Sequence, residues 1–122
     1  MARVLVVEDE FIIAAHIATL IEEAGCEVVG PTGALNEARE LASREDLDAA
    51  TLDISLEGAA IDDIAGILSQ RGIPFLFVSG YGREHLPAAF RDRPLVGKPF
   101  DEATFVRAVL DMVAGRTGDV AN

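Results

Sequence analysis

The stretch RVLVVEDE, from Arg3 to Glu10, joins a short apolar run to three consecutive acidic residues. An apolar run of this length, bounded by polar residues, is typical of a strand that is buried on both faces. A helical pattern follows it, with one apolar face formed by Ile13, Ile17, Leu20 and Ile21. A buried strand followed by an amphipathic helix is the repeating unit of α/β folds, so the rest of the chain should repeat it.

The alternation continues to the end of the chain. Further strand-like runs lie at Cys26–Gly30, Asp48–Leu52, Pro74–Val78 and, more weakly, Pro94–Gly97. Apolar helical faces lie between and after them: Leu35, Ala38, Leu41 and Ala42; Ile61, Ile64, Ala65 and Leu68; Phe105, Val106, Val109, Leu110 and Val113. Five strands alternating with five helical segments predict an α/β fold with a single five-stranded parallel sheet and helices on both faces.

Length and charge limit what the protein can be. The chain has 122 residues, half of them hydrophobic, which predicts one domain over residues 1–122, with a core at about 3–114 and a frayed tail at 115–122. Twenty-one acidic residues against ten basic ones give a net charge of -11. This charge argues against nucleic acid or an anionic membrane surface as a partner.

Cysteine content and hydropathy predict a cytoplasmic protein. The single cysteine, Cys26, cannot form an internal disulfide, and the amino terminus reaches acidic residues too early for a secretory signal. The longest apolar helical segment is too short to cross a membrane. His16 and His85 are isolated histidines and are not expected to bind a metal.

Polar residues follow four of the predicted strands. They are Glu8 and Asp9, Asp53, Ser79, and Lys98. Ligands of such sheets bind beyond the carboxyl ends of the strands, so these groups should share one pocket. Crowded carboxylates repel one another unless a cation lies among them, and a few oxygen ligands completed by water suit Mg²⁺. The lysine and the serine then suit the oxygens of a phosphoryl group.

The same residues predict an acyl phosphate. The chain has neither GxxxxGK[ST] nor GxGxxG, so no nucleotide-binding loop is visible and the phosphoryl donor must bring its own leaving group. Asp53 is the best nucleophile, because Glu8 and Asp9 are adjacent and better placed to share a metal.

The chain resembles the receiver domain of bacterial two-component response regulators. The resemblance rests on VVEDE after the first strand, LDISLEG around Asp53, FVSG after the fourth strand and GKPF after the fifth. It implies a flavodoxin-like (βα)5 fold with strand order 2-1-3-4-5. It also implies that Asp53 is the phosphoacceptor and that Lys98 pairs with the phosphoryl group, with a cis peptide bond before Pro99.

The resemblance further implies the ligands of Mg²⁺ and the role of the serine. Asp53 and Asp9 would bind the metal directly, Glu8 mostly through water, and Ser55 through its backbone carbonyl. Ser79 would donate a hydrogen bond to the phosphoryl group.

The fourth predicted strand also resembles the PFxFATGY motif of the FATGUY subgroup. Receivers commonly carry a switch aromatic three residues before the lysine, where this chain has Leu95, and Tyr81 follows Ser79 by two positions. A short helix is expected from about Leu86 or Pro87 to before Pro94. We therefore predict that Ser79 reorders residues 80–93, with Tyr81 changing its packing, in place of an aromatic swing at position 95.

The resemblance implies a signalling role and no enzyme activity toward other substrates. A sensor histidine kinase, possibly of the HWE type, would donate the phosphoryl group. A downstream protein or phosphotransferase would receive the signal, or the domain would act as a phosphate sink, because a stand-alone receiver carries no output domain. Two alternatives stay open: an aspartate-nucleophile phosphohydrolase, and a pseudo-receiver that binds a partner without phosphorylation.

Overall fold

The sheet has the predicted strands and the predicted order. In the computed structural model, which describes residues 1–53, 58–80 and 82–117, the strands are β1 (Arg3–Val7), β2 (Glu27–Thr32), β3 (Ala49–Asp53), β4 (Phe75–Ser79) and β5 (Leu95–Gly97). They form one sheet in the order β2-β1-β3-β4-β5, and every neighbouring pair is parallel. Every residue of β3 and β4 is buried, as expected for central strands covered on both faces.

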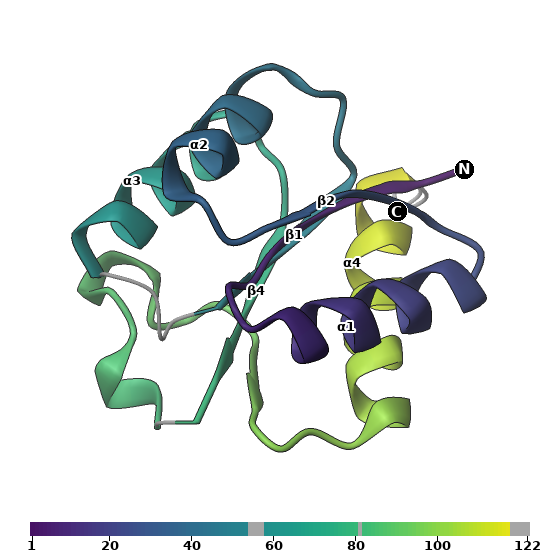
Figure 1. The fold of residues 1–122 in the computed structure, drawn as a ribbon. Coiled ribbons are helices and arrows are strands. Elements are labelled where there is room, and N and C mark those ends of the chain that lie inside the picture. The colour runs from purple at the N-terminus through teal and green to yellow at the C-terminus, as the bar shows by residue number, and fades with distance from the viewer. Residues whose placement is uncertain (54–57, 81, 118–122) are drawn as a thin grey trace.

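Helices cover both faces of the sheet (Figure 1). The helices are α1 (Phe11–Glu23), α2 (Leu35–Arg44), α3 (Gly58–Gln70) and α4 (Glu102–Thr117). Leu5 and Val7 of β1 pack with α2 and α3, whereas Val4 and Val6 pack with α1 and α4. Successive side chains of a strand point to opposite faces, so β1 supplies both cores. No helix in the described part of the chain has the length and the apolar character needed to span a membrane.

Most of the predicted helical faces are buried. Ile17, Leu20 and Ile21 of α1 are buried, while Ile13 only packs against the edge of that core. The prediction for Leu110 is wrong, because this side chain is 39% exposed. The buried positions of α4 are Phe105, Val109 and Met112, and a residue directly after Val109 points about 100° away from them.

The predicted helix between β4 and β5 is replaced by two 3-10 turns. These are η1 (Arg83–His85) and η2 (Ala88–Phe90), so the described residues contain four α-helices and not five. Pro87 and Pro94 leave too few residues between them for a stable α-helix, because the first turn costs more backbone entropy than its single hydrogen bond recovers.

Arginine side chains take over the role of the missing helical hydrogen bonds. Arg83 donates to the carbonyls of Arg91 and Arg93, both at 2.8 Å. Arg91 donates to the carbonyls of Leu86 at 3.3 Å and Glu84 at 3.1 Å. We refer to residues 82–93 as the arginine-tied segment, since side chains hold its backbone in place.

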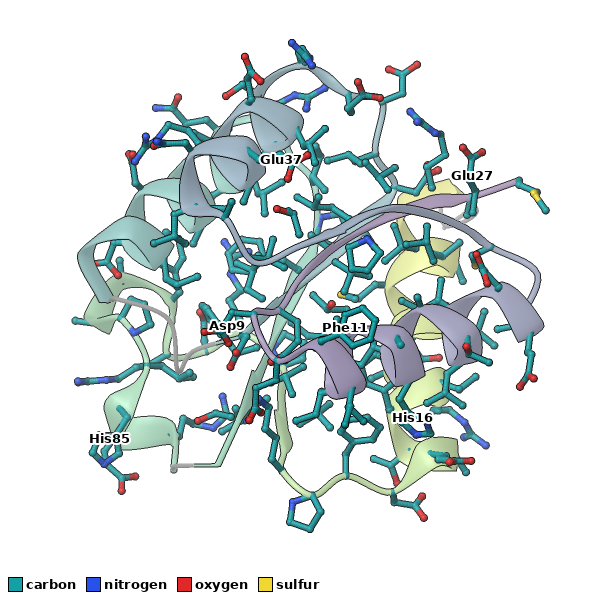
Figure 2. The ribbon with its side chains drawn as sticks, viewed as in Figure 1. Asp9, Phe11, His16, Glu27, Glu37 and His85 are labelled. Carbon is teal, nitrogen blue, oxygen red and sulfur yellow. The ribbon has the colours of Figure 1, made fainter. Side chains whose placement is uncertain are left out.

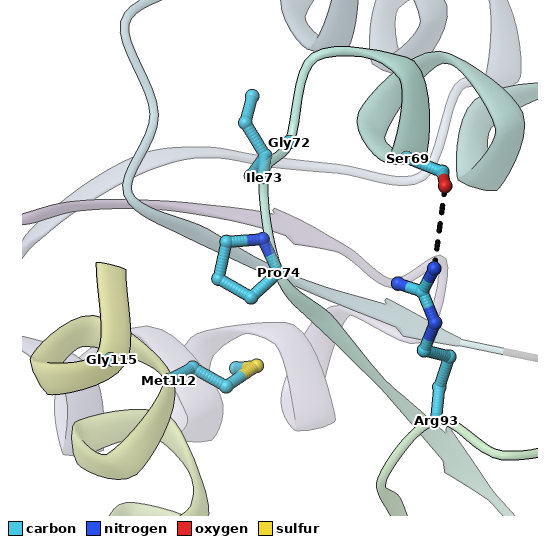
Figure 3. A pocket seen from close by; sticks show the side chains of 7 residues that line it. All are labelled: Ser69, Gly72, Ile73, Pro74, Arg93, Met112 and Gly115. Atoms are coloured by element: carbon cyan, nitrogen blue, oxygen red, sulfur yellow. Dashed lines mark hydrogen bonds between the residues drawn. The ribbon is translucent and has the colours of Figure 1, made fainter. Parts of the chain in front are cut away.

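The end of this segment is anchored to the core by Arg93. Its guanidinium carbon lies 4.5 Å from the ring centroid of Phe75, and its Nη2 atom donates to Ser69 at 3.3 Å (Figure 3). These contacts border a shallow hollow of about 420 Å³, which Pro74 and Met112 also line. The hollow lies at the amino end of β4, the end opposite to the predicted acidic pocket.

Candidate functional site

The carboxyl ends of the strands gather the predicted polar residues. Asp53 and Ser79 are the last residues of β3 and β4, and Glu8 and Lys98 directly follow β1 and β5. Glu8 is 3% exposed, and Asp53 and Ser79 are each 1% exposed. Burying carboxylates costs free energy unless they are paired, so this cluster needs a compensating positive charge.

Three carboxylates could share a metal ion. Ligand oxygens of Glu8, Asp9 and Asp53 all lie within 4.8 Å of one another. Asp9 is exposed, so water can reach the cluster on this side (Figure 2). Hard oxygen ligands with room for water fit Mg²⁺. The fourth predicted ligand, the carbonyl of Ser55, lies outside the described residues.

Lys98 supplies the nearest positive charge. Its Nζ atom lies 3.3 Å from Oδ1 of Asp53, 3.3 Å from Oε1 of Glu8 and 3.8 Å from Oε1 of Glu10. Burial disfavours the charged ammonium, but Asp53 and Glu8 outweigh that effect and raise the pKa of Lys98. The lysine therefore stays protonated at neutral pH and can face a phosphoryl oxygen.

The surroundings of Glu8 show that Lys98 alone does not balance the negative charge of the pocket. Burial, the hydrogen bond to Asp53 and the charge of Asp53 raise the pKa of Glu8 to about 7. Its Oε1 atom is near Lys98, but it accepts no hydrogen bond of good geometry among the described residues. A buried carboxylate oxygen that lacks a well-formed hydrogen bond fits a site that takes a cation. This oxygen is therefore a candidate ligand for a metal ion.

Ser79 is joined to the lysine through the backbone. The amide of Lys98 donates to the carbonyl of Ser79 at 2.7 Å, and Ser79 pairs with Gly97 in the register of β4 and β5. The peptide bond before Pro99 is cis, as the family resemblance implied. The serine and the lysine therefore keep a fixed spacing beside Asp53.

Of the other two predicted switch residues, the structure describes only Leu95. Leu95 is half-buried, pairs with Phe77 and packs against the core under α2 and α3. Tyr81 lies outside the described residues. The switch role of Ser79, Tyr81 and Leu95 therefore stays a prediction.

Two residues of the site were missed by sequence reasoning. Glu10 approaches Lys98, and its amide donates to Oε2 of Glu8 at 3.2 Å. Gly33 lies so close to Asp9 that a Cβ added there would be 2.6 Å from the Asp9 Cα atom. The run of three acidic residues could have indicated Glu10, whereas no pattern in the sequence indicates that Gly33 meets Asp9.

Comparisons with known proteins agree with this geometry. The family model described as the response regulator receiver domain matches residues 4–110. The chain is 31% identical over 111 residues to the transcriptional regulatory protein PdtaR of Mycobacterium tuberculosis, a match that covers 88% of this chain and 54% of PdtaR. The chain thus spans about half the length of this curated relative.

Solved structures of response regulators are also similar to this chain. The BeF3-activated conformation of SdrG from Pseudomonas melonis Fr1 matches with a TM-score of 0.75 and 31% identity, covering 91% of this chain and 95% of SdrG. The receiver domain of PhyR from Erythrobacter litoralis matches with a TM-score of 0.80 and 28% identity, covering 99% and 96% of the two chains.

Proposed function

Because the chain belongs to the family of response regulator receiver domains, we propose that Asp53 is its phosphoacceptor, with Mg²⁺ bound between Asp53, Asp9 and Glu8. The observation that carries this proposal is the buried cluster of Glu8 and Asp53 around Lys98, in which one oxygen of Glu8 accepts no hydrogen bond of good geometry among the described residues. A dication would offset the negative charge that Lys98 alone leaves uncompensated in this cluster.

The proposed reaction is an in-line phosphoryl transfer. A carboxylate oxygen of Asp53 attacks phosphorus, the bond from phosphorus to the donor breaks, and the donor leaves with the bonding electrons. Lys98 neutralises charge on the phosphoryl oxygens, and the Ser79 hydroxyl donates a hydrogen bond to one of them. Bound Mg²⁺ would supply further charge stabilisation. Asp9 would hold it directly and Glu8 mostly through water, with the Ser55 carbonyl as a further ligand.

The proposed partners are proteins. The donor is a sensor histidine kinase, and the resemblance to the FATGUY subgroup makes kinases of the HWE type the first to test. The phosphorylated domain passes its signal to a protein partner or a phosphotransferase, or serves as a phosphate sink. The net charge of -11 supports protein partners over nucleic acid, and the lone buried Cys26 supports a cytoplasmic location.

Labelling from acetyl phosphate tests the proposal. We expect Mg²⁺-dependent incorporation of one phosphoryl group that is acid-labile and released by hydroxylamine, as an acyl phosphate should be. Steady release of phosphate from p-nitrophenyl phosphate would instead indicate a phosphohydrolase. Such enzymes usually carry a second aspartate two residues after the nucleophile, and this chain has Ser55 at that position. The absence of both labelling and phosphate release would indicate a pseudo-receiver that only binds a partner.

Profiling against purified histidine kinases would then identify the donor. We expect fast transfer from a small subset of kinases and slow transfer from the rest. We expect kinases of the HWE type to be among those with fast transfer. Uniformly slow transfer from them would contradict the proposed membership of the FATGUY subgroup.

A further inference from the structure

The side chain of His16 bridges α1 and α4. His16 lies in the second turn of α1, the helix that begins directly after Asp9 and Glu10. Its Nε2 atom is 3.1 Å from Oε2 of Glu102, the first residue of α4, and Figure 2 shows His16 beside this helix. The histidine that is isolated in the sequence thus contacts the helix that follows Lys98.

His16 also belongs to a stack of aromatic rings. Its ring centroid lies 5.7 Å from that of Phe100, with 23° between the ring planes. Phe100 in turn stacks with Phe105 at 5.0 Å and 28°, and Phe105 is fully buried. Both separations are within the range of favourable aromatic pairs. Phe100 is therefore held by a core residue of α4 and by a residue of α1.

Phe100 is only two residues after Lys98. The intervening residue is Pro99, whose ring fixes one backbone dihedral, so little freedom separates the stacked ring from the lysine. The Nζ atom of Lys98 must stay near Asp53 to face a phosphoryl group, and it lies 3.3 Å from Oδ1 of Asp53. Any shift of Phe100 should therefore displace the lysine.

We propose that His16 is a positioning residue for Lys98. By stacking with Phe100 and pairing with Glu102, His16 fixes the loop after β5 against α1. The ammonium group of Lys98 then faces the phosphoryl group on Asp53. This inference rests on the proposed function of the pocket.

A role in stability alone would predict a different result. The side chains of His16 and Glu102 are 44% and 62% exposed, and a polar contact this exposed contributes little to stability. Loss of His16 should therefore change the free energy of unfolding little. Its effect should appear in the rate of phosphorylation and in the environment of Lys98.

A double-mutant cycle tests whether His16 acts through Lys98. The rate of labelling by acetyl phosphate in Mg²⁺ is measured for His16→Ala in the wild-type and the Lys98→Ala backgrounds. We expect a loss of about three- to tenfold with Lys98 present and less than about twofold without it, because coupled residues are not additive. His16→Phe, which keeps an aromatic ring but loses the pair with Glu102, should give an intermediate rate.

Val109→Ala is the matched control. Val109 is buried in the core cluster that contains Phe105, so its truncation destabilises the α4 side of the sheet without removing the His16 contacts. Its labelling rate per folded molecule should equal that of the wild type. The Nζ resonance of Lys98, recorded with beryllofluoride and Mg²⁺, should shift in His16→Ala and not in Val109→Ala.

The outcomes separate this inference from the proposed function. Equal losses in both backgrounds, an unchanged rate in His16→Ala, or an unmoved Lys98 resonance would overturn the positioning role. If Asp53→Asn abolishes labelling in the same assay, the proposed function survives that failure. If Asp53→Asn still labels fully, the proposed function itself is wrong.

Discussion

The acidic pocket lies at the carboxyl ends of the strands, whereas the arginine-tied segment connects β4 to β5, and the two regions are held in place by different interactions. Glu8, Asp53 and Ser79 sit at the ends of buried strands, whose backbone register fixes their spacing. Residues 82–93 contain only two 3-10 turns, and guanidinium groups on the surface bind several of their carbonyls. Positions fixed by the sheet suit chemistry, whereas a segment held by a few side chains can change conformation at low cost.

The largest expected effect is the loss of phosphorylation when the pocket loses its nucleophile. Asp53→Asn should abolish labelling by acetyl phosphate or a phosphorylated histidine kinase, because the amide is a far weaker nucleophile. Lys98→Ala should keep Mg²⁺ binding and lose labelling efficiency. Isotopic labelling followed by acid treatment measures both variants, and full labelling of the asparagine variant would refute the phosphoacceptor assignment.

Because Glu8 is buried, we expect its negative charge to destabilise the folded state. The pKa of Glu8 is raised from 4.5 to about 7, so the folded state binds more protons than the unfolded state between these values. Without Mg²⁺, the free energy of unfolding should fall as the pH rises from 4.5 to 7, by about 3 kcal/mol in total.

The variant Glu8→Gln removes this titration. It should be more stable than the wild type above pH 7 and about equally stable below pH 4.5. Urea denaturation in the presence of a chelator measures the difference, and an equal pH dependence of the two proteins would show that Glu8 does not carry it.

The metal ligands should differ in importance. Asp9→Ala should weaken Mg²⁺ binding by at least about tenfold, because it removes a direct ligand, and Glu8→Ala should weaken it less. Titration with Mg²⁺, followed by fluorescence or NMR, gives both affinities. Equal losses would contradict the proposed division between a direct and a water-mediated ligand.

A smaller effect should come from Gly33, which only supports the pocket. In Gly33→Ala the new Cβ atom would lie 2.6 Å from the Asp9 Cα atom, which is too close, so Asp9 must move. We expect a few-fold loss of Mg²⁺ affinity. Gly66→Ala in α3 is the control, since its Cβ meets open space and alanine favours a helix by up to about 1 kcal/mol. A Gly33→Ala variant with normal Mg²⁺ affinity would show that Asp9 tolerates the shift.

The smallest changes are expected in the arginine-tied segment. Beryllofluoride with Mg²⁺ should shift or broaden the amide NMR signals of residues 80–93 more than others outside the pocket. Tyr81→Ala should reduce this response and Leu95→Val should leave it nearly unchanged. Arg83→Ala should enlarge the broadening, because it removes both bonds to the carbonyls of Arg91 and Arg93. A silent segment with changes concentrated around Leu95 would favour a switch in β5.

Much of the pocket could be predicted because its residues stand next to strands. Asp53 and Lys98 are found at once when the apolar runs are placed in a parallel sheet, since the carboxyl ends of the strands meet at one edge. In the structure, the Nζ atom of Lys98 lies 3.3 Å from a carboxylate oxygen of Asp53 and 3.3 Å from one of Glu8. The switch prediction depends on Tyr81, which lies outside the described residues, and on a segment that forms two 3-10 turns in place of the expected helix.

Local sequence patterns predict structure less well where contacts between distant residues determine the conformation. The prediction of a helix from about Leu86 or Pro87 is wrong, because Pro87 and Pro94 leave too few residues between them, and Arg83 and Arg91 instead bind backbone carbonyls several residues away. His16 looked isolated because its partners, Phe100 and Glu102, are more than 80 residues away along the chain.

The alternation of strands and helices follows from the residue pattern alone, because a strand buried on both faces and a helix with one apolar face have distinct periodicities. The chemical character of the pocket likewise follows from the residues that end those strands. Three contacts depend instead on how the chain packs in three dimensions: Gly33 abuts Asp9, Glu10 approaches Lys98, and His16 joins α1 to α4. These contacts join residues from different elements, and their distances depend on how the helices pack on the sheet, which no local periodicity encodes.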